Sequence, residues 1–533
     1  MLFHTWPFLV FMLIVLPGFF ALRRTRLWLP WLTAASYFFY GWWNPYYLLL
    51  VVYSTLLDFC LVALMDHCPR TGEKVEVLSR LTRLRFDNRA LQVAFVFSAA
   101  AALGLLALAW AGPQTLRPAM AVLGLIVLLM ALGALYSSRG IWLLISLVNN
   151  LALLLFFKYA RFVVENLNAV FSSLHFSLKL SDPSTLMPFG FEYVLPVGIS
   201  FFTFQSLSYT IDFYLGKVER ERNFLRFATF VCFFPQLMAG PIERARHLLP
   251  QFHRFPPVRL ANFTDGASLF LVGLFKKLAL ANYLSFYVDR VYDNPKIFGA
   301  PALILATFAF AWQIFFDFSG YTDMARGIAK LMGFELILNF NNPYLATGLG
   351  DFWSRWHIGL SSWFRDYVYI PLGGNQRGAF NTYRNLFLTF LISGLWHGAA
   401  WTFVIWGILH ALGTMITREL ERSAFYRDRV PRLLKQLGVF LFVCFAWIFF
   451  RAGSLEDALL IVTRIFTAAW PDPQMPALML LLVLLIWLYQ FFYESRFRPI
   501  LQTDAIRVGV AVFMVLYLCL CASGGGAFIY FQF

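Results

Sequence analysis

The feature that most constrains this chain is a series of long apolar runs separated by short loops rich in Lys and Arg. Runs such as Tyr46 to Leu64 and Ala300 to Phe318 have the length and apolar character of membrane-spanning helices. Of the 533 residues, 60% are hydrophobic and only 13% are charged, a balance far from that of a soluble domain. The sequence therefore predicts an all-α polytopic membrane protein with about 11–14 transmembrane or re-entrant helices.

The basic loops indicate how the chain is oriented. The first apolar run is followed by Arg23, Arg24 and Arg26 and has no Lys or Arg before it, which is the reverse of a signal peptide. A second basic loop, roughly 66–89, falls where the alternation of spans also predicts the inside. The Lys and Arg residues behind the net charge of +15 are therefore interpreted as loop residues that orient the helices in the membrane. We expect the N-terminus outside and no binding of nucleic acid.

Cysteine usage gives no sign of a metal or of a disulfide framework. The six cysteines include no CxxC motif and no regular spacing. We expect small apolar side chains at these positions, no metal site and no permanently bound cofactor.

Three segments depart from simple apolar spans. Phe233 to Phe252 is interrupted by Gly and Pro, a pattern typical of a re-entrant or interfacial loop whose amides must be satisfied by protein or by a wet cavity. Asp317 and Asp323 around Gly320 predict a polar kink. Lys158 to Tyr193 is mixed in character, and its amphipathic part is expected to lie along the outer surface.

Ionisable side chains concentrate between Asp351 and Leu412, among many aromatic residues. Such groups are costly at membrane depth, so their presence implies a functional reason. The stretch FWSRWHIGLSSWF has the spacing of one helix, with Phe352, Trp356 and Trp363 on one face. This region is the predicted site.

Two histidines are the candidate catalytic residues. His357 would lie about one ~100° helical step from that aromatic face, with Ser361 one turn along. His397, in the segment SGLWHGAAW, lies 40 residues further on, enough for a helix, a turn and a second helix to bring the two together. Histidine can act as a general base near neutral pH, although a structural histidine bonded to a backbone carbonyl is the alternative. His410 would lie about 140° around the same helix as His397, and a structural role is expected for it.

The chain contains no GxSxG, no Cys beside a His and no HExxH, so no nucleophile is recognisable. A pair of histidines without a nucleophile fits direct transfer of a group between two bound substrates.

A set of ordered motifs resembles a known family. These are PVGISFFTFQSLSYTIDFY, FFPQLMAGPIER, GLFKKLALAN, FDFSGYTDMARGIAKLMGF, FNNPY, FWSRWHIGLSSWFRDYVYIPLGGNQRG, NLFLTFLISGLWHGAAW and the terminal FIYFQF. With them, from about Ile141 to the C-terminus, the sequence resembles the membrane-bound O-acyltransferase (MBOAT) family, and within it the bacterial branch of the alginate O-acetylase type.

This resemblance implies a fold and a domain organisation. The fold is a ring of tilted helices around a central funnel. Residues 141–533 would form the acyltransferase core, and residues 1–140 would be N-terminal spans that include an extra helical hairpin at 91–136. The protein would be a multi-pass protein of the bacterial inner membrane with a periplasmic N-terminus.

The resemblance also implies an activity and partners. His397 would be the central catalytic residue, and the position of His357, held in the family by His, Asn or Asp, would be the second. An acetyl group would pass from a cytoplasmic thioester, acetyl-CoA or a similar donor, across the membrane for O-acetylation of an exported polysaccharide such as alginate or another exopolysaccharide. A periplasmic acetyltransferase protein and membrane lipid are the expected partners.

Further substrate contacts are expected from polar and aromatic side chains near these motifs. They are Trp356, Ser361, Trp396, Asp317, Tyr321, Lys276 and Lys277. The two lysines could meet the donor's phosphates as point charges, with anchoring at the membrane interface as the alternative. Arg365 and Asp366 are expected to form a structural ion pair.

Other functions stay open. Within the enzyme class these are peptidoglycan O-acetylation and D-alanyl transfer to teichoic acid. A polytopic transporter is the alternative from a different class, favoured by broken helices and intramembrane charges. The absence of an internal repeat and the paired histidines count against it.

Overall fold

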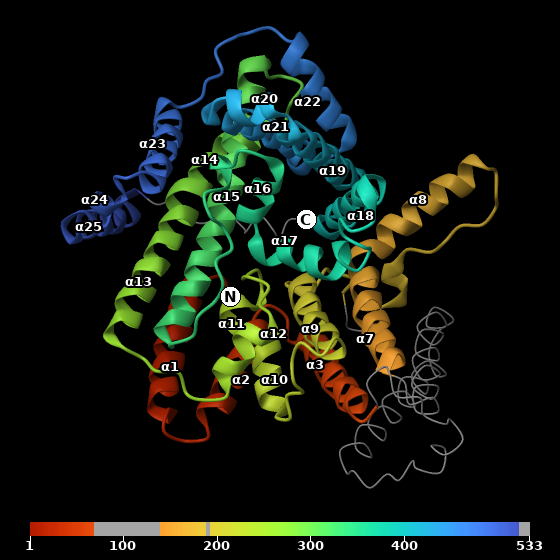
Figure 1. Ribbon diagram of the computed structural model, residues 1–533, viewed down its shortest axis with the longest axis vertical. Helices are drawn as coiled ribbons and strands as arrows, with labels where there is room; N and C mark the ends of the chain where they lie inside the picture. The colour runs from red at the N-terminus through yellow and green to blue at the C-terminus, as the bar shows by residue number, and fades with distance from the viewer. Residues whose placement is uncertain (69–138, 188–191, 522–533) are drawn as a thin grey trace. The chain divides into compact units, whose positions relative to one another are not determined.

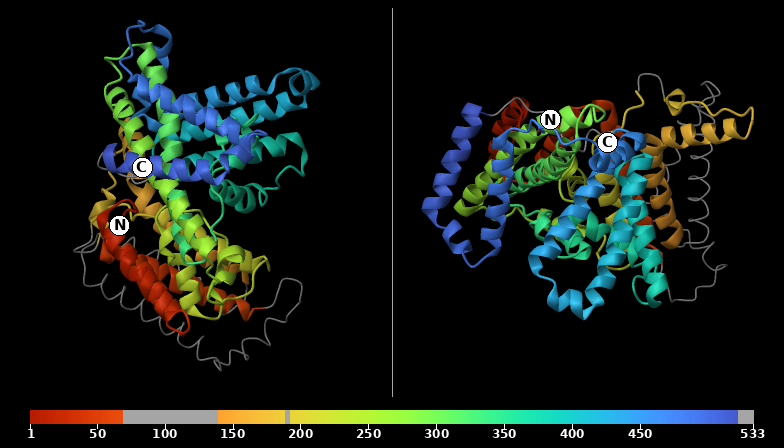
Figure 2. Two further views of the ribbon diagram at one scale, coloured as in Figure 1. Left: turned by 90° about the vertical axis from the view of Figure 1, so that its left-hand side faces the viewer. Right: turned by 90° about the horizontal axis from the view of Figure 1, so that it is seen from above.

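The computed structural model describes residues 1–68, 139–187 and 192–521. Within these ranges all regular structure is helical and no strand occurs (Figure 1 and Figure 2). Six helices in the described ranges are long and apolar enough to cross a membrane. The predicted all-α polytopic membrane fold is confirmed. The extra hairpin at 91–136, most of the basic loop at 66–89 and the terminal FIYFQF motif lie outside the described residues.

The chain divides into two compact units. The first consists of Val10–Met238 and Glu243–Pro256 together with Met1, and the second of Leu2–Leu9, Ala239–Ile242 and Pro257–Phe533. Every candidate site residue named from the sequence belongs to the second unit.

The first unit is built from helices of unequal length, shown from red to yellow in Figure 1. They are α1 (Trp6–Leu22), whose first four residues belong to the second unit, α2 (Trp28–Gly41), α3 (Pro45–Asp66), α7 (Arg139–Leu154), α8 (Ala160–Ser173), α9 (Ile199–Tyr214), α10 (Phe224–Cys232), α11 (Phe234–Leu237) and α12 (Ala245–Leu248). A polar contact joins α3 to α7, because the buried Asp58 carboxylate accepts hydrogen bonds from Ser146 Oγ at 2.6 Å and from Asn150 Nδ2 at 3.0 Å. Buried polar groups of this kind are stable only when bonded.

The segment after α7 continues as a helix. A π-helical turn at Leu155–Tyr159 links α7 to α8, so helix runs to Ser173. Figure 1 shows α8 leaving α7 at an angle, and a π-helical turn is a recognised cause of such a bend. No side chain of α8 is buried. Its position along the outer membrane surface stays a prediction.

The segment from Phe233 to Phe252 is broken as predicted. Two four-residue helices, α11 and α12, are separated by non-helical residues 238–244, and a 3₁₀ turn closes the segment at Leu249–Phe252. All residues from 233 to 245 are buried. The irregular backbone is thus enclosed by protein, as the cost of unpaired amides requires.

The second unit carries the remaining helices. They are α13 (Leu260–Phe275), α14 (Asn282–Tyr292), α15 (Ala300–Leu331), α16 (Leu349–Arg355), α17 (Ile358–Phe364), α18 (Gly378–His397), α19 (Trp401–Arg422), α20 (Ala424–Arg429), α21 (Arg432–Arg451), α22 (Leu455–Thr467), α23 (Ala477–Glu494), α24 (Arg498–Leu501) and α25 (Asp504–Cys521). Helix α15 is the most enclosed of the six candidate spans, with 78% of its apolar window buried. It forms the centre of this unit.

Glycines let α13 and α15 pack closely. Gly266 faces Gly327 and Gly273 faces Gly320, so each helix contributes two glycines seven residues apart. A Cβ added to Gly320 would lie 2.7 Å from the Gly273 carbonyl oxygen, and one added to Gly327 would lie 2.6 Å from that of Gly266. Small residues at such crossings allow backbones to approach in the membrane, where helices gain little from apolar burial.

The predicted polar kink at Asp317–Asp323 is wrong, because α15 runs unbroken through it. The two carboxylates instead pair with lysines of the π-helical segment Lys276–Ala281, which follows α13. Lys277 Nζ lies 2.7 Å from Asp317 Oδ1, and Lys276 Nζ lies 2.6 Å from Asp323 Oδ2. The charges are neutralised by the neighbouring helix, so the backbone of α15 need not break.

Replacing Gly320 by Ala is expected to lower the free energy of unfolding by about 1–3 kcal/mol, because the new Cβ meets backbone that cannot move aside alone. Thermal unfolding of the purified protein in detergent measures this. Gly438→Ala in α21 is the matched control, since nothing lies within 4 Å of its added Cβ, and it should leave stability unchanged or slightly raised. Equal unfolding temperatures for Gly320→Ala and the unmodified protein would contradict the close approach.

Candidate active site

The segment predicted as one helix, FWSRWHIGLSSWF, is two helices, α16 and α17, separated at His357. His357 has φ 44° and ψ 55°, a left-handed conformation that few residues other than glycine adopt. Trp356 before it is extended. The prediction that His357 lies beside an aromatic helix face is therefore wrong, and the imidazole instead occupies the N-cap position of α17.

Asn339 fixes this break. Its side-chain Oδ1 accepts a hydrogen bond from the Gly359 amide at 3.1 Å and lies 3.1 Å from His357 Nδ1. Its backbone carbonyl accepts from the Ile358 amide at 2.9 Å. Asn339 is fully buried. These bonds satisfy amides that a broken helix would otherwise leave unpaired in an apolar interior.

The same network sets the tautomer of His357. The Asn339 atom that accepts the Gly359 backbone N–H must be the oxygen of the side-chain amide, because the nitrogen of that amide cannot accept. Nδ1 of His357, which lies against the same oxygen, must therefore donate to it. His357 is fully buried, and the Phe318 ring meets it edge-on with centroids 4.7 Å apart. Burial favours the neutral imidazole. The lone pair of His357 is therefore on Nε2.

His397 is the last residue of α18, and the next helix, α19, starts at Trp401. The extended backbone at Gly398 and Ala400 separates the two helices. His410 thus lies on α19, and its predicted place on the same helix as His397 is wrong. The misplaced boundary follows from the apolar run, which continues through the turn and hides it.

Glycines flanking His397 allow the close backbone approach expected from the sequence. A Cβ on Gly394 would lie 3.2 Å from the Cα of Gly407 on α19, and one on Gly398 would meet the ring of Phe403. The α18–α19 hairpin is therefore tightly closed at its turn, and it holds His397 against α19.

A single indole contacts both candidate histidines. The Trp396 ring centroid lies 4.9 Å from that of His397 and 6.3 Å from that of His357, and both pairs meet edge-on. His397 is 5% exposed and also contacts the rings of Trp406 and Phe450, at 4.9 and 5.4 Å. The structure thus brings the two predicted histidines, from separate helices, into one buried aromatic cluster.

His410 belongs to the same aromatic cluster. The sequence did not predict that His410 would lie there. Its ring lies 4.7 Å from Trp406 and 5.0 Å from Trp353. Neither ring nitrogen has a hydrogen-bond partner among the described residues. Trp406 contacts His397 as well, so one indole links these two histidines. This contact could have been predicted if the turn between α18 and α19 had been placed correctly in the sequence.

Trp356 and Ser361, two other residues predicted from the sequence, support the core around the break, and Tyr321 is also buried. Trp356 is fully buried, and its indole meets the Phe340 ring edge-on at 5.1 Å. The Ser361 hydroxyl donates to the carbonyl of Trp356 at 2.9 Å, which satisfies a backbone acceptor at the break. Tyr321 is buried and stacks on Phe3 at 4.7 Å.

The charged residues named from the sequence form ion pairs. Lys276 and Lys277 lie near the middle of the candidate span Leu260–Tyr292 and pair with carboxylates of α15. Contact with the donor's phosphates and anchoring at the membrane interface both stay predictions. Arg365 Nε lies 2.9 Å from Asp366 Oδ1, which confirms the expected pair.

This arrangement is suited to proton transfer. A neutral imidazole can take a proton from a hydroxyl group, and a closed aromatic surrounding keeps water from competing for it. In the part of the chain that the structure describes, no group of three or more His, Cys, Asp or Glu side chains could hold a metal ion.

We expect His357→Asn to retain the thermal stability of the unmodified protein, because Asn tolerates left-handed backbone better than other side chains. His357→Val should lower the free energy of unfolding by about 1–3 kcal/mol, since a β-branched residue is strained there. Thermal unfolding of both variants in the same detergent distinguishes them. Equal stability of the two would contradict the left-handed break.

Lys277→Met is expected to lower the free energy of unfolding by about 3–5 kcal/mol, because it removes the ammonium that pairs with the buried Asp317 carboxylate. The double variant Lys277→Met with Asp317→Leu should recover most of that loss. Thermal unfolding of single and double variants measures the recovery. If Lys277 served only the donor's phosphates, the single variant would unfold like the unmodified protein.

Comparison with known proteins places this site in a family. The model of the MBOAT, membrane-bound O-acyltransferase, family matches residues 219–455, a range that contains His357 and His397. A probable alginate O-acetylase of Pseudomonas putida is 43% identical over 320 residues, 60% of this chain and 63% of that protein. The peptidoglycan O-acetyltransferase of Helicobacter pylori is 38% identical over 348 residues, 60% of this chain and 64% of that protein.

A less similar relative is matched over a larger share of its own length. The teichoic acid D-alanyltransferase of Bacillus subtilis is 30% identical over 274 residues, 48% of this chain and 68% of that protein. The alginate and peptidoglycan relatives are matched over about three fifths of their own length. Given these matches and the multi-pass helical fold, the chain belongs to the membrane-bound O-acyltransferase family.

Proposed function

We propose that this protein is a membrane O-acetyltransferase. It would move an acetyl group from a cytoplasmic thioester, acetyl-CoA or a similar donor, to hydroxyl groups of an exported polysaccharide. The observation that carries the proposal is the buried cluster in which Trp396 contacts both His357 and His397. Membership of the MBOAT family and the names of the relatives support the reaction class.

In the proposed reaction His397 is the general base. Its imidazole takes the proton of the acceptor hydroxyl as that oxygen attacks the carbonyl carbon of the thioester. The carbon–sulfur bond then breaks, and the departing thiolate receives the proton from the imidazolium. The acceptor is a sugar hydroxyl or a serine of a periplasmic acetyltransferase partner. Nothing is oxidised or reduced.

His357 has a positioning role in this scheme. Its Nδ1–H is directed to Asn339, so Nε2 is an acceptor and cannot donate to a thioester carbonyl while the ring is neutral. That geometry favours orienting the donor through one of its N–H or O–H groups over polarising its carbonyl.

The acceptor we propose first is alginate or another exopolysaccharide, because the alginate O-acetylases that match are 41–43% identical to this chain. Peptidoglycan is the second candidate, favoured by the relative at 38% identity. D-Alanyl transfer ranks below both, since the named D-alanyltransferases are 28–30% identical.

The proposal includes a location and a division of labour. The protein would span the bacterial inner membrane with its N-terminus in the periplasm. Residues 141–533 would form the acyltransferase core.

We expect His397→Ala to lower the acetyl ester content of one exported polymer about 10²–10⁴-fold, to the level of a deletion, because the general base is lost. The measurement compares exopolysaccharide and peptidoglycan from cells with the unmodified protein, the deletion and the variant at equal membrane level. His410→Phe, placed in the same aromatic cluster, is the matched control and should keep acetylation. Full acetylation with His397→Ala would contradict the assignment of the base, and unchanged esters in the deletion would contradict the function.

A further inference from the structure

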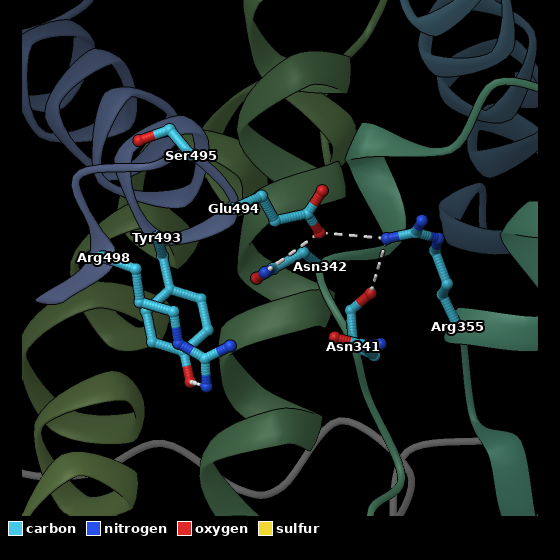
Figure 3. A pocket seen from close by; sticks show the side chains of 7 residues that line it. All are labelled: Asn341, Asn342, Arg355, Tyr493, Glu494, Ser495 and Arg498. Atoms are coloured by element: carbon cyan, nitrogen blue, oxygen red, sulfur yellow. Dashed lines mark hydrogen bonds and ion pairs between the residues drawn. The ribbon is translucent and has the colours of Figure 1, made fainter.

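A polar pocket of about 400 Å³ lies beside the helix break, in the second unit. Figure 3 shows its lining side chains, which are Asn341, Asn342, Arg355, Tyr493, Glu494, Ser495 and Arg498. They come from the loop after α15, from the end of α16 and from the junction between α23 and α24. No role proposed for the histidines accounts for this concentration of polar groups.

Glu494 organises one wall of the pocket. Its Oε1 lies 3.0 Å from Arg355 Nη1 and accepts a hydrogen bond from Asn342 Nδ2 at 3.3 Å, and its Oε2 lies 3.6 Å from Arg432 Nη2. Arg355 Nε also lies 2.7 Å from Asp351 Oδ1. The guanidinium of Arg355 is therefore held rigidly between two carboxylates, with its charge compensated.

Arg498 supplies a charge of a different kind. Its guanidinium lies over the Tyr493 ring, with Cζ 4.5 Å from the centroid, and Nη2 donates to the Tyr493 hydroxyl at 3.2 Å (Figure 3). Among the described residues its recorded side-chain contacts are with Tyr493, and the Glu494 carboxylate pairs instead with Arg355 and Arg432. A guanidinium stacked on a ring keeps its orientation and offers a planar set of donors that matches phosphate. The pocket thus presents an oriented, uncompensated positive charge.

The charges of the flanking loops indicate the side of the membrane on which the pocket opens. The loop before α23, residues 468–476, has no Lys or Arg, whereas residues 495–507 after it contain Arg496, Arg498 and Arg507. The basic segment 423–435, which contains α20 and the start of α21, meets the same end of α23, because Arg432 Nη2 lies 3.6 Å from Glu494 Oε2. By the positive-inside rule this end is cytoplasmic.

The wall of the pocket is continuous with the segment that holds His357. The Asn341 amide donates to the Arg355 carbonyl at 2.9 Å, and the Ile358 amide donates to the Asn339 carbonyl at 2.9 Å. The chain segments 339–341 and 355–358 are thus paired on both sides of the break. A group seated against Arg355 lies on the same paired segments as the candidate positioning histidine.

We propose that this pocket binds a phosphate group of the acyl donor, with Arg498 as the main contact and Arg355 and Asn342 beside it. The inference rests on the proposed function for the nature of the donor, a phosphate-bearing thioester. The phosphate of an anionic lipid has the same chemistry. The cytoplasmic side and the continuity with the His357 segment favour the donor.

The test is calorimetric binding to the full chain in nanodiscs of phosphatidylcholine. Coenzyme A and pantetheine, which lacks the phosphates, are the two probes. Arg498→Gln should weaken coenzyme A binding about tenfold or more, because a charge-assisted bond is lost, and should leave pantetheine binding unchanged. Arg496→Gln is the matched control. Arg496 stacks on Phe497 with Cζ 5.2 Å from the centroid and does not line the pocket, so this variant should bind both probes like the unmodified protein.

Three results would overturn the inference. In the first, Arg498→Gln binds coenzyme A like the unmodified protein. In the second, Arg496→Gln loses as much affinity as Arg498→Gln. In the third, native mass spectrometry in phosphatidylglycerol nanodiscs shows an Arg498-dependent lipid while coenzyme A fails to bind, which assigns the pocket to a headgroup.

The assay requires no acetyl transfer, so the two proposals fail separately. If coenzyme A binds through Arg498 but the deletion strain keeps its acetyl esters, only the proposed function is overturned. Acetylation that depends on His397 without any binding of coenzyme A would overturn the pocket alone.

Discussion

The site depends on one buried amide side chain, that of Asn339. A helix can be interrupted in an apolar interior only if the freed backbone groups find other partners. Asn339 supplies them for the break at His357, through its own carbonyl and its Oδ1, and the same oxygen directs the His357 proton to Nδ1. The same residue thus satisfies the backbone at the helix break and determines which nitrogen of the imidazole carries the proton.

Much of the fold was predictable from the sequence because its causes are local. Long apolar runs form helices, and Gly and Pro interrupt the helix at 233–252. Arg365 and Asp366 form an ion pair because they are neighbours in the sequence. Each of these effects depends only on residues close together in the chain. The glycines beside His397 likewise indicated close packing, and Gly394 and Gly398 provide it.

The features that sequence reasoning missed have causes that are distant along the chain. The pattern around His357 reads as one helix because nothing nearby shows that Asn339, 18 residues before it, will satisfy the broken backbone. The carboxylate of Asp317 suggested a kink because its partner Lys277 lies 40 residues earlier. The polar pocket at Arg498 was likewise not foreseen, because its walls come from three separate segments.

The most direct test is a double-mutant cycle between Asn339→Ala and His357→Ala, read as acetyl ester content at equal membrane level. If Asn339 acts by holding the break and orienting His357, each single variant lowers acetylation and the double variant is no worse than the more severe single one, because the two changes remove one shared interaction. If the two losses multiply as independent effects, Asn339 and His357 do not act together, and the account of the site is wrong.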